Sequence, residues 1–246
     1  MRLFFRNTGI FIFLFAAVWI ALGIALAQVP QQELHLWLNQ HHGPAADIFF
    51  RYYTLIAEYG IYVAVAALLF YKAGDALFLL ISELLAGGVC QIIKHIVRAP
   101  RPASVFDIAN NHDALPLVEG VKMHLHNSFP SGHSSTFFVL FFGLLLIYSN
   151  SSLNLPNDNY PDADKRLYKK SKTRQMVCQV LCFVFALLGA YSRIYLSQHF
   201  AADIFAGGLI GLTITFLVYL LFQRLDTYYG PLYAKHICVN KRQKAA

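Results

Sequence analysis

The chain has 246 residues, of which 57% are apolar, 15% aromatic and 13% charged. An average soluble domain carries roughly 25% charged residues, so a soluble fold is excluded, and the aromatic content excludes a disordered chain. The sequence therefore predicts an all-α, polytopic membrane protein. We interpret its net charge of +7 first as a signal of membrane topology, and not as evidence of nucleic-acid binding.

Six stretches of the chain are long and apolar enough, or nearly so, to cross a bilayer, which takes about 20 residues. The first begins after Arg2 and Arg6 and ends in Ala25-Leu26-Ala27, as a cleaved signal peptide would. Its apolar run exceeds the usual length of about 7–15 residues, which favours a retained anchor. The fourth is short, so we expect His133 and its upstream neighbours to extend it. The six stretches cover residues 9–27, 55–71, 76–93, 134–148, 176–191 and 204–222.

Lys and Arg residues are distributed unequally between the two sides of this bundle. If the N-terminus is cytoplasmic, 14 of the 20 fall on the cytoplasmic side, most of them in the stretch 165–174 and in the tail after residue 223. Basic residues favour the cytoplasmic side of a membrane. We therefore expect both termini of the chain in the cytoplasm.

The connections between the spans differ in length and composition. Residues 31–53 lie on the outer side, and the helical spacing of Leu34, Trp37 and Leu38 predicts a short helix on the membrane surface. Residues 102–129 form the longest outer loop, and long ordered loops are often functional. Residues 150–164 are rich in Ser, Asn, Asp and Pro, which predicts a cytoplasmic loop.

Three polar clusters fall at the outer ends of the last four spans. Charged side chains at this depth cost free energy unless they bind something, so the clusters predict one ligand site on the outer face. Arg presents a planar fork of donors that matches phosphate oxygens, and Lys adds a point charge. The candidate site residues are Lys94, Arg101, Ser131, Gly132, His133, Arg193, His199 and Asp203.

A site for a phosphoryl group needs charge neutralisation and a nucleophile, and both have candidates here. Gly132 allows the chain to approach a ligand closely, and the start of the fourth span adds free N–H groups. His199 and Asp203 are four residues apart, which places them on one face of a helix. A carboxylate beside an imidazole fixes its tautomer and stabilises the cation that forms as the ring nitrogen attacks. His133 then remains as a general acid for the leaving oxygen.

The three clusters follow one another as Lys94-x6-Arg101-Pro102, Pro130-Ser131-Gly132-His133 and Ser192-Arg193-x5-His199-x3-Asp203. In this order and spacing they resemble the three-part signature of the type 2 phosphatidic acid phosphatase (PAP2) superfamily, in its six-span bacterial lipid phosphatase branch. The resemblance covers the second to the sixth span and implies a single domain over residues 1–246.

This resemblance implies a metal-independent hydrolase without a cofactor, which forms a phosphohistidine intermediate. His199 would be the nucleophile, Asp203 its partner and His133 the acid. The residues that would bind the phosphate are Lys94, Arg101, Ser131, Gly132 and Arg193.

The enzyme would lie in the bacterial inner membrane with its site facing the periplasm. The substrate would be a lipid phosphate or diphosphate in the bilayer: undecaprenyl diphosphate, phosphatidylglycerol phosphate, phosphatidic acid or a lipid A phosphate. Two other functions stay open: phosphoryl transfer to a lipid acceptor, and transport of an anionic lipid or phosphate by a basic cluster that only binds it. No nucleic-acid partner is indicated, and the sequence fixes neither the headgroup nor the oligomeric state.

Several polar residues lie outside the motifs. We expect Glu83 to hydrogen-bond a neighbouring helix and Glu58 to lie at the level of the lipid headgroups. For the histidines of the long outer loop a solvated or substrate-facing position is favoured over a metal site; these are His112, His124 and His126. The glycines of the sixth span are expected to let helices approach closely; these are Gly207, Gly208 and Gly211.

Overall fold

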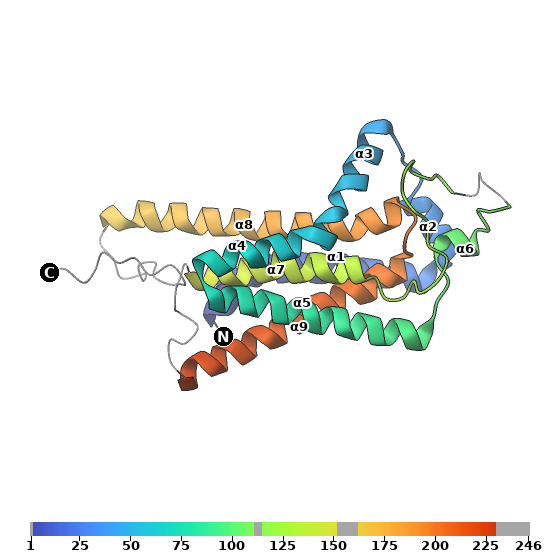
Figure 1. Ribbon diagram of the computed structural model, residues 1–246. Coiled ribbons are helices and arrows are strands. Elements are labelled where there is room, and N and C mark those ends of the chain that lie inside the picture. Colours follow the sequence, from blue (N-terminus) through green and yellow to red (C-terminus); the bar gives the residue numbers. More distant parts are fainter. Residues whose placement is uncertain (1, 111–114, 152–161, 230–246) are drawn as a thin grey trace.

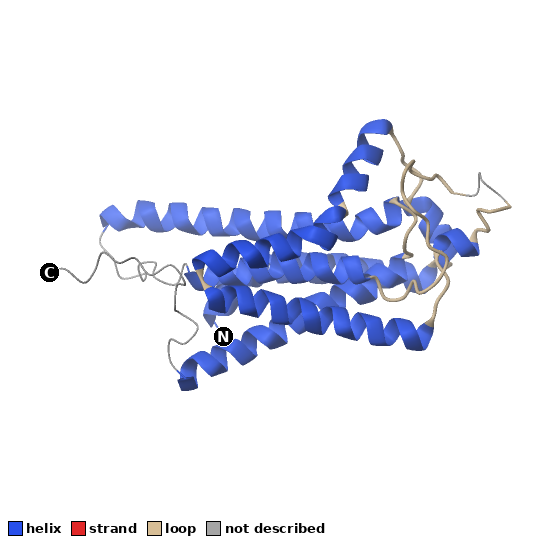
Figure 2. Cartoon of the chain, in the orientation of Figure 1, coloured by secondary structure: helices blue, strands red, loops and turns tan. Residues whose placement is uncertain are grey.

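The computed structural model describes residues 2–110, 115–151 and 162–229 of the chain. Within these residues it contains helices and no strand, as the composition predicted (Figure 2). In chain order the elements are α1 (Arg2–Gln28), α2 (Gln31–Leu38), α3 (Pro44–Tyr53), the π-helical turn η1 (Ile56–Gly60), α4 (Ile61–Tyr71), α5 (Ala73–Val97), α6 (Pro102–Val105), α7 (Gly132–Ser151), α8 (Asp162–Tyr195) and α9 (Ala201–Tyr229).

Six segments of the described chain are long and apolar enough to cross a membrane, which confirms the predicted number of spans. Helices α1, α4, α5, α7, α8 and α9 run lengthwise in one bundle, whereas α3 points away from it, and α2, α6 and the outer loops gather at one end (Figure 1). The start of α1 and the last turn of α9 lie at the opposite end (Figure 1). The six segments are Asn7–Gln28, Pro44–Tyr71, Ala73–Val105, Gly132–Ser149, Lys172–Tyr195 and Ala201–Leu225.

The second span begins earlier than predicted, at Pro44 instead of Leu55. α3 passes through the turn η1 and continues as α4, so α2 alone forms the short helix that was expected in residues 31–53. The prediction was wrong because Asp47 and Arg51 interrupt the apolar pattern of α3. Both are accommodated: Asp47 accepts a hydrogen bond from the hydroxyl of Tyr195, and Arg51 donates one to the backbone of the outer loop.

The N-terminal parts of α7 and α9 lie in close backbone contact. A Cβ atom on Gly207 would lie 2.3 Å from the carbonyl oxygen of Ser131, and one on Gly211 would lie 2.3 Å from that of Ser135. Only glycine fits at these two positions, which confirms the expected role of the glycines in the sixth span. The beginning of α7 is thereby held at a fixed distance from α9.

α2 is fixed beside the connection between α8 and α9, residues 196–200. The buried side chain of His35 packs edge-on against Phe200, with 5.2 Å between ring centroids. Nδ2 of Asn39 donates to Oγ of Ser197 at 2.7 Å. This short outer helix therefore supports the segment that carries His199.

The basic stretch 165–174 lies on a helix, because α8 begins at Asp162. Of the predicted loop 150–164, residues 152–161 lie outside the described residues, as do His112 and the tail after residue 229.

Candidate active site

The predicted site residues meet at the end of the bundle that carries α2 and α6. A cavity of about 550 Å³ lies there. Ser131 and Asp203 stand directly behind it, and the backbone N–H of Ser131 donates to the carbonyl oxygen of Asp203 at 2.9 Å. The remaining six predicted residues line the cavity: Lys94, Arg101, Gly132, His133, Arg193 and His199.

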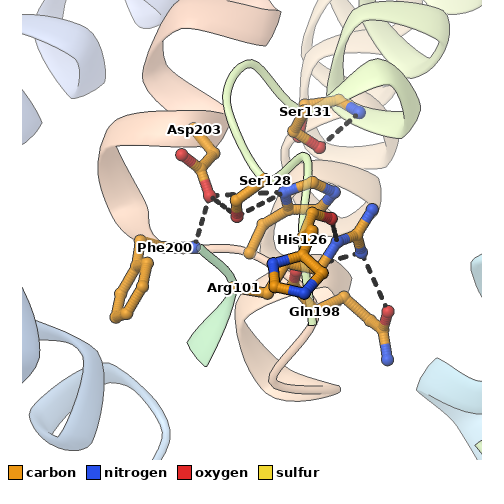
Figure 3. A network of polar contacts seen from close by, with 9 residues as sticks. Arg101, His126, Ser128, Ser131, Gln198, Phe200 and Asp203 are labelled. Carbon is orange, nitrogen blue, oxygen red and sulfur yellow. Dashed lines mark hydrogen bonds and ion pairs between the residues drawn. The ribbon is translucent and has the colours of Figure 1, made fainter. Parts of the chain in front are cut away.

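His199 and Asp203 form a buried pair at the start of α9. Nδ1 of His199 lies 3.3 Å from Oδ2 of Asp203, and each side chain is at most 4% exposed. The same oxygen accepts hydrogen bonds from Oγ of Ser128 at 2.5 Å and from the backbone N–H of Phe200 at 2.9 Å (Figure 3). With Nδ1 engaged in this network, Nε2 is the ring nitrogen available to a ligand in the cavity.

The segment that carries His199 is closed on itself by backbone hydrogen bonds. The N–H groups of Gln198 and His199 both donate to the carbonyl oxygen of Arg193, at 2.9 and 3.0 Å. Ser197 adopts the left-handed conformation, with φ of 49°, and donates to Ile194 at 2.8 Å. The last turn of α8 and the imidazole therefore form one rigid unit.

The surroundings of His199 favour its neutral form. Burial, together with the cations Arg101, Arg193 and Lys94, holds the pKa of His199 well below its usual range. A contact with the backbone of Ser128 opposes this effect, but burial and the cations dominate. A neutral imidazole has the lone pair that nucleophilic attack requires.

Arg101 is oriented by the outer loop and by the connection 196–200. Its Nε donates to the carbonyl oxygen of His126 at 3.0 Å, and one terminal nitrogen donates to the backbone and side-chain oxygens of Gln198 at 3.2 and 3.1 Å (Figure 3). The backbone N–H of Arg101 donates to Leu125, and that of Ser128 donates to Ala99. The two ends of the long outer loop are thus tied together beside the cavity.

Arg193 is the most deeply buried of the three predicted cations. A terminal nitrogen donates to Oγ1 of Thr54 at 2.6 Å. Its Nε is buried and has no hydrogen-bond partner among the described residues. An unpaired buried guanidinium donor beside a cavity is costly, so an anion in the cavity would stabilise it.

α7 begins at the cavity with Gly132 and His133. No atom lies within 4 Å of the position that a Cβ on Gly132 would take, so this position leaves room for a ligand against the backbone. Nε2 of His133 lies 3.3 Å from Oε1 of Glu58, which belongs to η1. Of the three imidazoles among the described residues that line the cavity, those of His133 and His199 each lie beside a carboxylate.

Ser131 and Glu83, two polar residues singled out from the sequence, have hydrogen-bond partners within the helix bundle. Oγ of Ser131 receives the backbone N–H of Ser134 at 3.3 Å, so this hydroxyl caps α7 behind the cavity instead of lining it. Oγ1 of Thr136 on α7 donates to Glu83 on α5 at 2.7 Å, which confirms the expected bond between helices.

Four residues that hydrogen-bond the predicted site residues were not identified from the sequence: Thr54, Glu58, Ser128 and Gln198. Glu58 had been placed only at headgroup level. Ser128 and Gln198 adjoin the second and third clusters, and this proximity was the only available signal. Their partners are 71 or more residues away in the chain, a distance that no local pattern spans.

A profile of the PAP2 superfamily matches residues 75–226, which include all three clusters. The chain belongs to the PAP2 superfamily. Its structure is similar to the crystal structure of LpxE from Aquifex aeolicus, with a TM-score of 0.58 and 20% identity over 79% of this chain and 98% of that one. It is also similar to a transmembrane PAP2-type phosphatidylglycerolphosphate phosphatase from Bacillus subtilis, with a TM-score of 0.54 and 20% identity over 91% of this chain and 99% of that one. No curated protein sequence matched the chain.

Proposed function

We propose that this PAP2 protein is a lipid phosphatase that hydrolyses a phosphate monoester or diphosphate through a phosphohistidine on His199. The observation that carries the proposal is the buried His199–Asp203 pair at the wall of a cavity with three signature cations, one of which has an unpaired donor. Such a site combines a neutral nucleophile with fixed charges for a phosphoryl group.

In the first step, Nε2 of His199 attacks phosphorus, and the bond from phosphorus to the leaving oxygen breaks. Asp203 accepts a hydrogen bond from the N–H group at Nδ1 and stabilises the cation that forms on the ring. His133 gives its proton to the leaving oxygen, and Glu58 stabilises the protonated imidazole beforehand. Lys94, Arg101 and Arg193 neutralise the phosphoryl oxygens.

In the second step, water attacks the phosphorus of phosphohistidine. His133 takes a proton from this water, the bond between phosphorus and Nε2 breaks, and inorganic phosphate leaves. The residues above supply the nucleophile, the acid, the base and the charge neutralisation, and on this basis we propose that the reaction needs no metal ion or cofactor.

Apolar residues at the cavity support a substrate whose chains stay in the bilayer. Tyr52 and Leu55 line the cavity from the α3–α4 segment, and both are exposed. Val121 and Leu196 complete this part of the wall. A phosphate attached to an acyl or prenyl chain would place its polar end on the cations and its chain against these residues.

We further propose that the site faces the periplasm and that the protein resides in the bacterial inner membrane, because of the unequal distribution of basic residues. The solved relative that is titled a phosphatidylglycerolphosphate phosphatase supports phosphatidylglycerol phosphate as one candidate substrate. Undecaprenyl diphosphate, phosphatidic acid and a lipid A phosphate are the other candidates. No nucleic-acid partner is proposed.

The test is phosphate release by the purified protein in detergent, from these four lipids and in the presence of EDTA. His199→Ala should lower the rate by about 10⁴-fold or more at an unchanged melting temperature. His95→Ala is the matched control, since this exposed imidazole lies next to Lys94 in the last turn of α5 and does not line the cavity. Substrate movement without phosphate release would favour a transporter, and phosphate recovered on an added lipid would favour a transferase.

A further inference from the structure

The cavity carries more positive charge than one phosphoryl group neutralises. The described residues that line it include five lysines and arginines and a single acidic residue, Glu58, which already lies against His133. A phosphoryl group carries roughly two negative charges near neutral pH. Two cations, Arg51 and Lys122, do not belong to the signature that binds this group. An excess of this kind indicates a second anionic group in the ligand.

Arg51 is held in a defined position at the mouth of the cavity. One terminal nitrogen donates to the carbonyl oxygen of Glu119 at 3.0 Å. Gly120, with φ of 74°, lies so close that a Cβ atom there would be 2.5 Å from the other terminal nitrogen. The guanidinium is thus packed against the outer loop, while α3 and that loop together form one wall of the cavity. None of the ion pairs found within the described residues involves Arg51.

Lys122 is connected to the signature cations through its backbone. Its carbonyl oxygen accepts a hydrogen bond from Nε2 of Gln198 at 3.1 Å, and Oε1 of Gln198 accepts one from Arg101 at 3.1 Å. This chain of contacts fixes the Lys122 segment relative to Arg101. As for Arg51, no carboxylate of the described chain lies within ion-pair distance of the Lys122 ammonium.

Lys122 and the signature cations act on the same space, which Arg51 also lines. His124 lines the cavity, and its pKa is lowered by burial first and then by Arg101, Lys122, Arg193 and Lys94. Cations of the signature and Lys122 of the loop therefore all raise the potential at one point of the cavity. A ligand that fills this space meets both groups at once.

We propose that Arg51 and Lys122 form a second anion subsite, which holds an uncleaved phosphate next to the phosphoryl group on the signature cations. The site then prefers a lipid diphosphate to a lipid monophosphate. This inference rests on the proposed function. Nε2 of His199 forms its bond with the terminal phosphorus, and the bond from that phosphorus to the bridging oxygen breaks. The lipid monophosphate leaves with this oxygen and a proton from His133, and the subsite binds its phosphate.

The first test compares kcat/KM for farnesyl diphosphate and farnesyl monophosphate, which share one chain. We expect the wild-type protein to favour the diphosphate, and the double variant Arg51→Gln/Lys122→Gln to lose about tenfold of that preference. Arg98→Gln is the control, because Arg98 is an exposed cation at the same end of the bundle that does not line the cavity. A wild-type preference for the monophosphate, or a preference that the double variant retains, would overturn the subsite.

Arg51 also supports the outer loop, so two single variants separate charge from packing. Lys122→Gln, which alters an exposed side chain, should lower the preference for the diphosphate by itself. Arg51→Lys retains the charge and should keep most of the preference. If only Arg51→Gln had an effect, and both substrates suffered equally, Arg51 would be a support for the loop and the proposal would be wrong.

The second test measures binding without turnover. In the His199→Ala protein, calorimetry in detergent compares farnesyl methylenediphosphonate with farnesyl phosphonate. The substitutions Arg51→Gln and Lys122→Gln should weaken the diphosphonate about tenfold more than the monophosphonate. If the wild-type protein released phosphate from none of the lipids, this binding result would refute the proposed function and leave the subsite standing. Equal weakening of both ligands would refute the subsite alone.

Discussion

The pairs Glu58–His133 and Asp203–His199 have similar geometry, because in both a carboxylate oxygen lies 3.3 Å from a ring nitrogen. The two pairs differ in exposure: Asp203 is buried, whereas the side chain of Glu58 is 44% exposed. A buried carboxylate whose Oδ2 contacts Ser128, Phe200 and the imidazole orients a nucleophile. An accessible carboxylate can remain in contact with an acid that has to lose and regain its proton in each turnover.

Substitutions of His133 and Glu58 should depend on the leaving group. If His133 protonates the leaving oxygen, His133→Ala should lower kcat/KM for a lipid phosphate by about 10²–10⁴-fold and spare an aryl phosphate, whose leaving group needs no proton. Glu58→Gln should show the same pattern at about tenfold. The measurement is kcat/KM for both substrates with each variant. Equal losses for the two substrates would contradict the acid role and leave His133 as a binding residue.

The pH dependence should reflect the lowered pKa of His199. A base whose pKa is lowered keeps its lone pair as the pH falls through the ordinary value of 6.5, and loses it only below the lowered pKa. The acid limb of kcat/KM should therefore lie well below pH 6.5, after correction for the second ionisation of the substrate phosphate near pH 6. A corrected limb at pH 6.5 would mean that the Asp203 carboxylate outweighs burial and the cations.

At the scale of elements, the backbone contact between α7 and α9 leaves no room for an added methyl group. Gly207→Ala would place a Cβ 2.3 Å from the Ser131 carbonyl oxygen and displace the turn that carries His133. We expect a loss of about 1–3 kcal/mol of stability together with a fall in kcat. Gly88→Ala is the control, since nothing lies within 4 Å of its new Cβ. The check is a melting curve and a phosphate-release assay on both variants; similar behaviour of the two would contradict the close contact.

Gly132→Ala should separate binding from folding within the same helix start. Its Cβ meets no protein atom within 4 Å, so the melting temperature should stay unchanged. The methyl group would occupy space next to the phosphate, and KM should rise about tenfold. An unchanged KM would show that the ligand does not approach the backbone here.

The local patterns of the chain predicted the elements well, and long-range partners poorly. Six apolar stretches and three clusters are local features, and the structure contains both. The start of the second span was misplaced because Asp47 and Arg51 find partners on α8 and on the outer loop, which the local pattern does not show. The same holds for Thr54, whose bond to Arg193 spans 139 residues. The capping role of Ser131 was missed because its position in the signature favoured the ligand over its own helix.

At the scale of the whole molecule, the orientation in the membrane remains a prediction from the basic residues, and two cysteines can test it. Asn110→Cys places a thiol on the exposed outer loop, and the native Cys238 lies in the tail after α9. A membrane-impermeant maleimide should label position 110 in spheroplasts and Cys238 only after permeabilisation. The other cysteines, Cys90, Cys178 and Cys182, lie within spans. Labelling of Cys238 from outside would reverse the topology and place the cavity in the cytoplasm.

The short connection between α8 and α9 has a consequence for how such an enzyme can diversify. Residues 196–200 hold the imidazole on a backbone that is closed on itself, so an insertion there would break the reaction centre. Arg51 and the outer loop come from other parts of the chain and line the same cavity. Mutations in the outer loop can therefore change the headgroup that the protein accepts without altering the residues that catalyse the reaction.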